Sequence, residues 1–197
     1  MSIAPDDVID HLAGIAPGAA LAAIRDGRLA ARENAQNSYL ALFTPSTSTD
    51  MALDERFAVA AFVAALHGDP AATAFYAGPL APSIATAIAA EAARGVRRGP
   101  YGSYPSPALS AENLPGPGFQ VSVTHRAAIG KRLNAALEHA HMLIFRPRDT
   151  DAATLQTLLD AGWSTTGIVT FSQLVAFLTF QLRTVAGLRT LAAMGGA

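Results

Sequence analysis

The chain has 197 residues, 51% of them hydrophobic, and its 14 lysine and arginine residues nearly balance its 15 aspartate and glutamate residues. This length suits a single domain, and a near-zero net charge without large basic clusters argues against a nucleic-acid partner. The chain contains no cysteine, which excludes disulfides, thiolate metal sites and any thiol-based redox cycle within it.

Alanine dominates the hydrophobic residues, and because alanine is the best helix former, the composition predicts an all-α fold. Three helices are expected first, at 6–13, 17–27 and 28–43, with Ile24 of the second facing inward. Aspartates begin the first helix, where carboxylates favour the positive end of the helix dipole. The polar run at 44–50 is expected to be a loop that supplies helix caps. The acidic N-terminal segment does not resemble a secretory signal, so a cytoplasmic location is expected.

The central stretch, residues 53–80, joins two apolar helices across a His-Gly-Asp-Pro break. Small residues follow helical spacing along the first of these helices, which suits the middle of a bundle. Gly68 is expected to end that helix and Pro70 to begin the next, as is typical for these two residue types. Another alanine-rich helix is predicted at 83–94.

A segment rich in proline, glycine and serine, residues 95–124, divides the domain into an N-terminal half (1–94) and a C-terminal half (125–197). Connections of this length in compact domains are usually lids, binding arms or disordered segments. Its tyrosine and phenylalanine residues favour an ordered arm that lies over the core or over a neighbouring subunit. Alternating apolar residues at 119–123 are typical of a short strand.

The C-terminal half is expected to contain helices at 125–145, at 151–162 and from about 165 to 193. The last helix is apolar nearly all round, which predicts that it is buried or shared between subunits. A homo-oligomer is therefore expected. Arg183 lies within this helix, and because a charge inside a membrane is costly, a buried helix is favoured over a membrane span.

Two stretches resemble the carboxymuconolactone decarboxylase and alkylhydroperoxidase-like superfamily. The sequence ERFAVAAFVAALHGDPAATAFY, at 55–76, is similar to its core helix pair. The region 155–188 is similar to its ending, where a short leucine-rich helix, a glycine and a capped turn precede a long apolar helix. The resemblance implies an orthogonal helical bundle of the alkylhydroperoxidase-like type that assembles into dimers, trimers or hexamers.

Peroxidase members of this superfamily carry a Cys-x-x-Cys motif between a glutamate and a histidine. In one alignment of this chain the thiol positions fall on Asp69 and Ala72, and in another they fall on His67 and Pro70. Both alignments lack the thiolates that attack the peroxide and resolve the sulfenate. Thiol peroxidase activity is therefore excluded for this chain alone.

Resemblance to the decarboxylase branch of the superfamily implies a cofactor-free enzyme. Such an enzyme needs only acid/base groups that act on a small organic acid or lactone. The candidate catalytic residues are His67, Glu55, Tyr76 and Arg56. Glu55 or His67 would transfer the proton, Arg56 would hold a carboxylate, and the Tyr76 hydroxyl would donate a hydrogen bond. Glu55 and His67 are about 18 Å apart along a straight helix, so they meet only if another element or a subunit bridges them.

Each candidate also has a structural interpretation. His67 precedes a glycine that ends a helix, where a cation is favourable, and Glu55 and Arg56 are first-turn charges. Tyr76 is the kind of aromatic residue that often lies in a core. The second functional hypothesis is accordingly a non-catalytic protein that retains the fold for assembly beside a thiol-bearing alkylhydroperoxidase-like partner.

A second polar cluster, Glu138, His139 and His141, lies in the helix predicted at 125–145. Glu138 and His141 are three residues apart and share one helix face. Metal sites in helical bundles draw ligands from several helices, and only Glu91 or His125 would add to this pair. The cluster is interpreted as a polar face near a pocket or an interface, and neither a metal nor a cofactor is expected.

Overall fold

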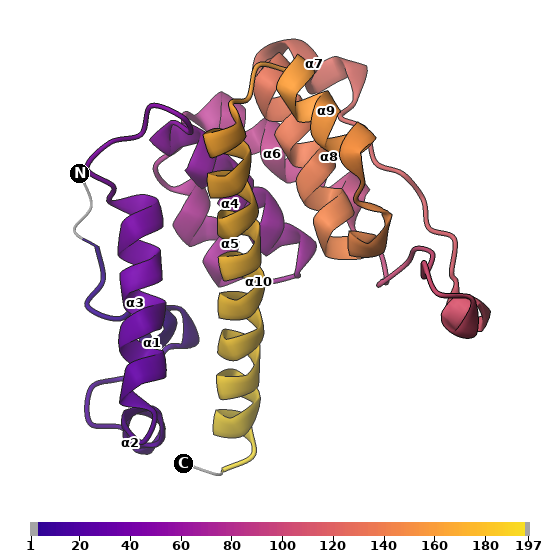
Figure 1. Cartoon of the computed structure of the whole chain (residues 1–197). Coiled ribbons are helices and arrows are strands. Elements are labelled where there is room, and N and C mark those ends of the chain that lie inside the picture. Colours follow the sequence, from indigo (N-terminus) through magenta and orange to yellow (C-terminus); the bar gives the residue numbers. More distant parts are fainter. Residues whose placement is uncertain (1–3, 196–197) are drawn as a thin grey trace.

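The chain folds into helices joined by loops and one long arm. The computed structural model describes residues 4–195, and across these residues it forms no β-strand (Figure 1). The predicted all-α class is therefore confirmed. The α-helices are α1 (Val8–Ala13), α2 (Ala20–Asp26), α3 (Leu29–Phe43), α4 (Leu53–Leu66), α5 (Pro70–Ala77), α6 (Pro82–Gly95), α7 (Val123–Ile129), α8 (Lys131–Phe145), α9 (Ala152–Asp160) and α10 (Thr165–Ala193), and the short 3-10 helices are η1 (Pro107–Glu112) and η2 (Pro147–Asp149).

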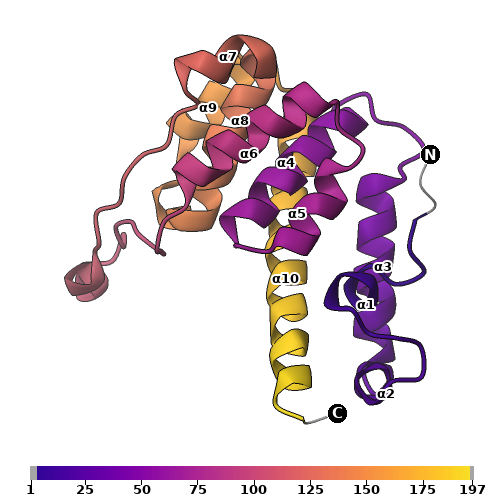
Figure 2. The same ribbon diagram turned by 180° about the vertical axis from the view of Figure 1, so that it is seen from behind.

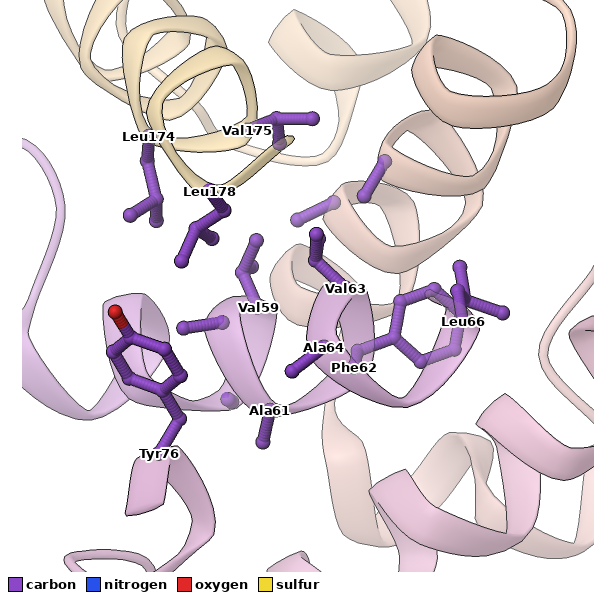
Figure 3. Close-up of a cluster of buried hydrophobic side chains, with 14 of the residues drawn as sticks. Val59, Ala61, Phe62, Val63, Ala64, Leu66, Tyr76, Leu174, Val175 and Leu178 are labelled. Carbon is purple, nitrogen blue, oxygen red and sulfur yellow. The ribbon is translucent and has the colours of Figure 1, made fainter. Parts of the chain in front are cut away.

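Helix α4 is central and packs against α5, α6, α8 and α10. In Figure 3, Leu178 of α10 is directed toward Val59 of α4, and Val63 and Leu174 lie beside them. All four side chains are fully buried. Much of the remaining surface of α4 is alanine, and such small side chains allow neighbouring helices to approach closely. The predicted boundary between α4 and α5 at Gly68 and Pro70 is confirmed.

Helices α1 to α3 lie together beside α10 (Figures 1 and 2). Asp7 caps α1 by accepting a 2.9 Å hydrogen bond from the backbone N–H of Asp10. The carboxylates of Asp7 and Asp10 also form ion pairs with Arg25 of α2 and Arg32 of α3. These ion pairs link the three helices to one another.

Helix α2 begins later than its sequence predicts. It starts at Ala20 and not at Pro17, because Gly18 has a φ of 78°, in the left-handed region, and interrupts the chain before the helix. Leu21 is buried as expected. Ile24 is 50% exposed, so its predicted inward position is wrong.

The connecting arm leaves the helical body between α6 and α7 and carries η1 at its outer end (Figures 1 and 2). The backbone N–H of Tyr101 donates to the carbonyl of Phe145 over 2.6 Å. Gly102 and Leu114 form an isolated β-bridge, which joins the outgoing and returning branches of the arm. The arm therefore has an ordered base attached to the end of α8.

The end of the arm packs on the helical core where a strand was predicted. Residues 119–123 form no strand, because no extended segment among residues 4–195 pairs with them. The Phe119 ring instead lies 5.6 Å from the Phe62 ring and stacks on the His141 ring at 4.7 Å. Side-chain packing here replaces strand pairing.

A glycine divides the helix that was predicted at 125–145. Gly130 has a φ of 86° and a ψ of 153°, outside the helical region, and separates α7 from α8. Helical patterns often tolerate an isolated glycine, so the spacing does not reveal this break. The break allows α7 to pack against α6 as well as α8.

Helix α10 is the longest helix and presents one side to α4. Of the two alternatives, burial or sharing between subunits, the single chain does not bury the helix on all sides, because Val169 is 57% and Phe180 is 49% exposed. Sharing between subunits stays a prediction. By length and composition alone α10 could cross a membrane, but 44% of its most apolar window is buried in the structure, and core helices of soluble proteins pass the same test.

Candidate functional site

Glu55, the first predicted catalytic residue, lies in the first turn of α4. Its carboxylate accepts hydrogen bonds from the backbone N–H of Ala52, at 2.9 Å, and from Nε of Arg132, at 2.6 Å. A carboxylate at this position satisfies a free N–H group and complements the helix dipole. Glu55 therefore joins the start of α4 to the start of α8.

Arg56, the next residue, is only 6% exposed. Its Nε donates to the carbonyl of Met51 over 3.0 Å, and its Nη1 donates to the carbonyl of Leu42 over 2.7 Å and to that of Ala41 over 3.5 Å. Burial lowers the pKa of Arg56, while the charge of Glu55 acts in the opposite direction. Arg56 satisfies carbonyls in the last turn of α3, which have no partner within the helix.

His67 and Tyr76 lie beyond the other end of α4. The Nε2 atom of His67 is buried without a hydrogen-bond partner in the described chain, and burial, followed by the charge of Arg183, lowers the pKa of its ring. Tyr76 is fully buried, and its hydroxyl donates a 2.6 Å hydrogen bond to Oε1 of Gln181 in α10. Burial raises the pKa of Tyr76, which keeps this hydroxyl protonated.

The structure places these four side chains in different contacts. No hydrogen bond or ion pair within residues 4–195 joins any two of them: Glu55 binds α8, Arg56 binds α3, and Tyr76 binds α10. They are not assembled into one acid/base group within a single chain. A catalytic role for them stays a prediction.

A different set of polar side chains gathers around a cavity of about 570 Å³ between α8, α9 and the end of the arm. The end of the arm packs on α8, where the Phe119 ring stacks on the His141 ring. The cavity is lined by Arg94, Gly118, Phe119, Gln120, Ala135, Glu138, His139, His141, Met142, Arg146, Thr154, Thr157 and Leu158. We call it the arm cavity.

His139 is the most buried basic group in the arm cavity that lacks a partner. Its side chain is 5% exposed, and its Nε2 atom has no hydrogen-bond partner in the described part of the chain. The edge of its ring meets the ring of Phe171 at 5.7 Å. Burial lowers the pKa of His139, so the imidazole is neutral at neutral pH. A neutral ring with an unsatisfied nitrogen can exchange a proton with a ligand or form a hydrogen bond with it.

His141 has a structural role in the same wall. Its Nε2 lies 2.8 Å from the carbonyl of Gly95, an acceptor, so Nε2 carries the proton. Burial lowers the pKa of His141, the hydrogen bond to Gly95 acts in the opposite direction, and the charges of Arg97 and Arg146 lower it further. His141 therefore holds the end of α6 against α8.

Two arginines give the arm cavity a positive wall. Nε of Arg146 is buried without a hydrogen bond among residues 4–195, although it lies 3.6 Å from Asp149. Arg94 forms a 2.5 Å ion pair with Glu91 and is 52% exposed. Glu138 is the only acidic residue in the wall, and its Oε1 already accepts a hydrogen bond from a backbone N–H. The lining residues thus include two arginines and one glutamate, and the acidic neighbours of the arginines, Glu91 and Asp149, are not among the lining residues.

Glu91 and His125, which were considered as additional metal ligands, instead anchor the arm. The fully buried carboxylate of Glu91 accepts hydrogen bonds from the hydroxyl and the backbone N–H of Ser122, and it lies 2.6 Å from Nδ1 of His125. Within residues 4–195, no group of three or more His, Asp or Glu residues is placed to hold a metal ion.

Sequence reasoning identified the histidines and Glu138 but not the two arginines of the arm cavity. Arg94 ends one half of the chain, and Arg146 ends a helix in the other half. Neither lies in a motif, and only the folded arm brings them to one cavity.

Comparisons of the chain with protein-family models, with curated proteins and with solved structures found no match. Membership in the carboxymuconolactone decarboxylase and alkylhydroperoxidase-like superfamily stays a prediction.

Proposed function

We propose that this protein binds a small organic acid or carboxylated lactone in the arm cavity and acts on it by cofactor-free acid/base chemistry. His139 carries this proposal, because its Nε2 is buried without a partner in the described chain and its side chain is among those that line a cavity with two arginines. Arg146 and Arg94 bind the carboxylate, and His139 transfers the proton. The catalytic residues of the proposal therefore differ from the four that the sequence suggested.

The chemistry of the lining supports this assignment. A guanidinium matches the geometry of a carboxylate, and such charged hydrogen bonds are stronger in a partly enclosed site than in water. Because burial lowers the pKa of His139, its imidazole is available as a base at neutral pH. Phe119 and Leu158 supply an apolar wall for the carbon skeleton of the ligand.

The superfamily resemblance supports the reaction type. A decarboxylase-like lyase needs no thiol, in agreement with the absence of cysteine from the chain. An alkylhydroperoxidase-like bundle, a homo-oligomeric assembly and a cytoplasmic location are parts of the same proposal.

The test is calorimetric titration with a panel of mono- and dicarboxylic acids and carboxylated lactones, with product formation followed by chromatography. We expect Arg146→Met to weaken binding about tenfold or more, since a charged hydrogen bond contributes roughly 1.5–3 kcal/mol. His139→Gln retains binding and lowers turnover about a hundredfold, which is typical for the loss of a general base. Arg98→Met, which removes an exposed arginine outside the cavity, is the matched control. Equal binding by Arg146→Met and Arg98→Met would contradict the proposal.

The exposed side of α10 favours a second candidate function, assembly. Val169, Ala176 and Phe180 are exposed at spacings of seven and four residues, as in a helix seam, and residues 165–182 contain no charged side chain. Charged residues are depleted from the cores of interfaces. A second copy of α10 is the proposed occupant, and a thiol-bearing alkylhydroperoxidase-like protein is the alternative partner.

The assembly function is tested by light scattering after size-exclusion chromatography. Wild-type protein is expected to be a dimer or larger, and Phe180→Glu is expected to release monomers that retain their helical circular dichroism. Thr190→Glu places the same charge on the exposed side of α10, near its end, and serves as the control. A monomeric wild-type protein would exclude the homo-oligomer.

A further inference from the structure

Arg56 lines a second cavity, of about 800 Å³, which is separate from the arm cavity. This space lies between the end of α3, the loop that follows it and the first half of α10. The cavity is lined by Ser38, Leu40, Ala41, Leu42, Thr44, Pro45, Ser46, Thr47, Arg56, Thr170, Gln173 and Phe177. We call it the loop cavity.

The charge of Arg56 is not balanced by an acidic side chain. None of the residues that line the loop cavity is acidic, and Arg56 forms no ion pair within residues 4–195. The carboxylate of the adjacent Glu55 is bound by Arg132. A buried charge with backbone carbonyls as its only partners still favours the approach of an anion.

The guanidinium of Arg56 also has unused donors. Its hydrogen bonds to Met51, Leu42 and Ala41 come from Nε and Nη1. The Nη2 amino group has no hydrogen-bond partner in the described chain. It also keeps some contact with solvent, because it does not belong to the buried polar atoms that lack a partner. Nη2 is therefore available at the wall of the cavity.

Uncharged donors surround this cationic group. Ser46 and Thr47 come from the loop, and Thr170 and Gln173 come from α10. No hydrogen bond to another described residue occupies these four side chains. The hydroxyls of Ser38 and Thr44, by contrast, donate to carbonyls within or at the end of α3.

We propose that the loop cavity is a second binding site, specific for a small oxyanion that accepts hydrogen bonds from Nη2 of Arg56 and from the side chains of Thr170 and Gln173. Inorganic phosphate and the phosphate or carboxylate group of a small organic molecule share this chemistry. The cavity exceeds the size of a free phosphate ion, which favours an organic molecule that carries the anionic group. This site is independent of the organic acid proposed for the arm cavity.

The test is calorimetric titration of the full chain at constant ionic strength with inorganic phosphate, glycerol phosphate and acetate, and with chloride as the reference salt. The titrations are also run on Arg146→Met, in which carboxylate binding to the arm cavity is weakened. There we expect saturable binding at one site, tightest for glycerol phosphate if the site is built for an organic phosphate and tightest for acetate if it is built for a carboxylate. Absence of saturable binding for all three probes overturns the proposal.

Two variants locate the bound anion. Arg56→Met removes the guanidinium and is expected to weaken binding at least tenfold. Since Arg56 also satisfies carbonyls of α3, the double substitution Thr170→Val and Gln173→Met on α10 provides a second test and is expected to weaken binding about threefold. If the double variant and every folded Arg56 variant bind like wild type, the proposal is overturned.

Arg146→Met distinguishes this site from the arm cavity. Anion binding to the loop cavity is expected to be unchanged in this variant, whether or not organic-acid binding to the arm cavity is lost. If Arg146→Met abolishes phosphate binding while Arg56→Met retains it, the anion lies in the arm cavity and the loop-cavity proposal is overturned.

Discussion

The hydroxyl of Tyr76 donates a 2.6 Å hydrogen bond to Oε1 of Gln181, joining α5 to α10 inside an otherwise apolar core. Neither side chain is exposed to solvent, and Nε2 of Gln181 has no partner within residues 4–195. Buried polar groups are costly unless they are paired. This hydrogen bond therefore offsets part of the free-energy cost of burying the tyrosine hydroxyl and the glutamine amide.

Tyr76→Phe is expected to destabilise the protein, because it leaves both polar atoms of the Gln181 amide buried without partners. The expected loss is about 1–3 kcal/mol in the free energy of unfolding. Adding Gln181→Leu to this variant removes the unsatisfied amide and should recover most of the loss. Urea denaturation followed by circular dichroism measures both effects. A double variant no more stable than Tyr76→Phe would contradict the explanation.

A second prediction concerns the buried carboxylate that anchors the arm. Burial alone would raise the pKa of Glu91, but hydrogen bonds from Ser122 and His125 and the charge of Arg94 lower it below its ordinary value of 4.5. The folded state therefore holds Glu91 ionised more strongly than the unfolded chain does. Its contribution to stability is present above pH 4.5 and is lost as the pH falls through the lowered pKa.

Glu91→Gln should consequently cost about 2–3 kcal/mol at neutral pH, as expected for the loss of charged hydrogen bonds. The difference in unfolding free energy between this variant and wild type should shrink as the pH falls below 4.5. Denaturant titrations across that interval measure it. A difference that is independent of pH would mean that the carboxylate charge does not stabilise the anchor.

The helix boundaries show how far local sequence patterns reach. The sequence places aspartates at the start of the first helix and offers Thr150 or Asp151, and Ser164 or Thr165, as the caps of the last two. In the structure the caps are Asp7, Asp151 and Ser164, and each side chain accepts a hydrogen bond from a backbone N–H in the first turn. These signals act over three or four residues and do not depend on the rest of the fold. The break at Gly130 could not be predicted in the same way, because an isolated glycine is often tolerated within a helix and the contact between α7 and α6 is not visible in the local sequence.

The candidate site was less predictable than the helices because it depends on long-range contacts. The sequence shows that Glu138, His139 and His141 lie on one helix. Which of these side chains lacks a hydrogen-bond partner depends on contacts with other helices. His141 is bonded to Gly95, whereas His139 is left without a partner for Nε2 among the described residues. No spacing rule distinguishes these two histidines.

A third prediction follows from the buried histidines. Burial lowers the pKa values of His67, His139 and His141 in the folded state, while the unfolded chain takes up protons near the ordinary value of 6.5. The protein should therefore lose stability as the pH falls below 6.5, until the lowered pKa values are reached. Each histidine that takes up a proton only on unfolding changes the free energy of unfolding by up to about 1.4 kcal/mol per pH unit.

Glutamine does not titrate, so in His139→Gln the unfolded chain takes up one proton fewer. The dependence of the unfolding free energy on pH should therefore become shallower below pH 6.5. The measurement is a series of denaturant titrations of wild type and variant between neutral pH and the onset of the Glu91 transition. An unchanged slope would show that His139 is not held in its neutral form by burial.

The last prediction concerns the approach of two parts of the arm. A Cβ atom added at Gly116 would lie 2.3 Å from Cγ and 2.5 Å from Cβ of Tyr101, near the root of that side chain. Tyr101 cannot retreat without disturbing its backbone hydrogen bond to Phe145. The carbonyl of Gly116 also lies 3.4 Å from Nη1 of Arg146, so the same displacement reaches the arm cavity.

Gly116→Ala should therefore loosen the base of the arm, at a cost of about 1–3 kcal/mol for overpacking. Hydrogen exchange should become faster at the amides of Gly102 and Leu114, which bond to each other across the arm, and stay slow in α4. Gly118→Ala is the matched control, because its Cβ would meet no atom within 4 Å. If the two variants exchange at the same rate, the close approach of Gly116 to Tyr101 does not hold the base of the arm.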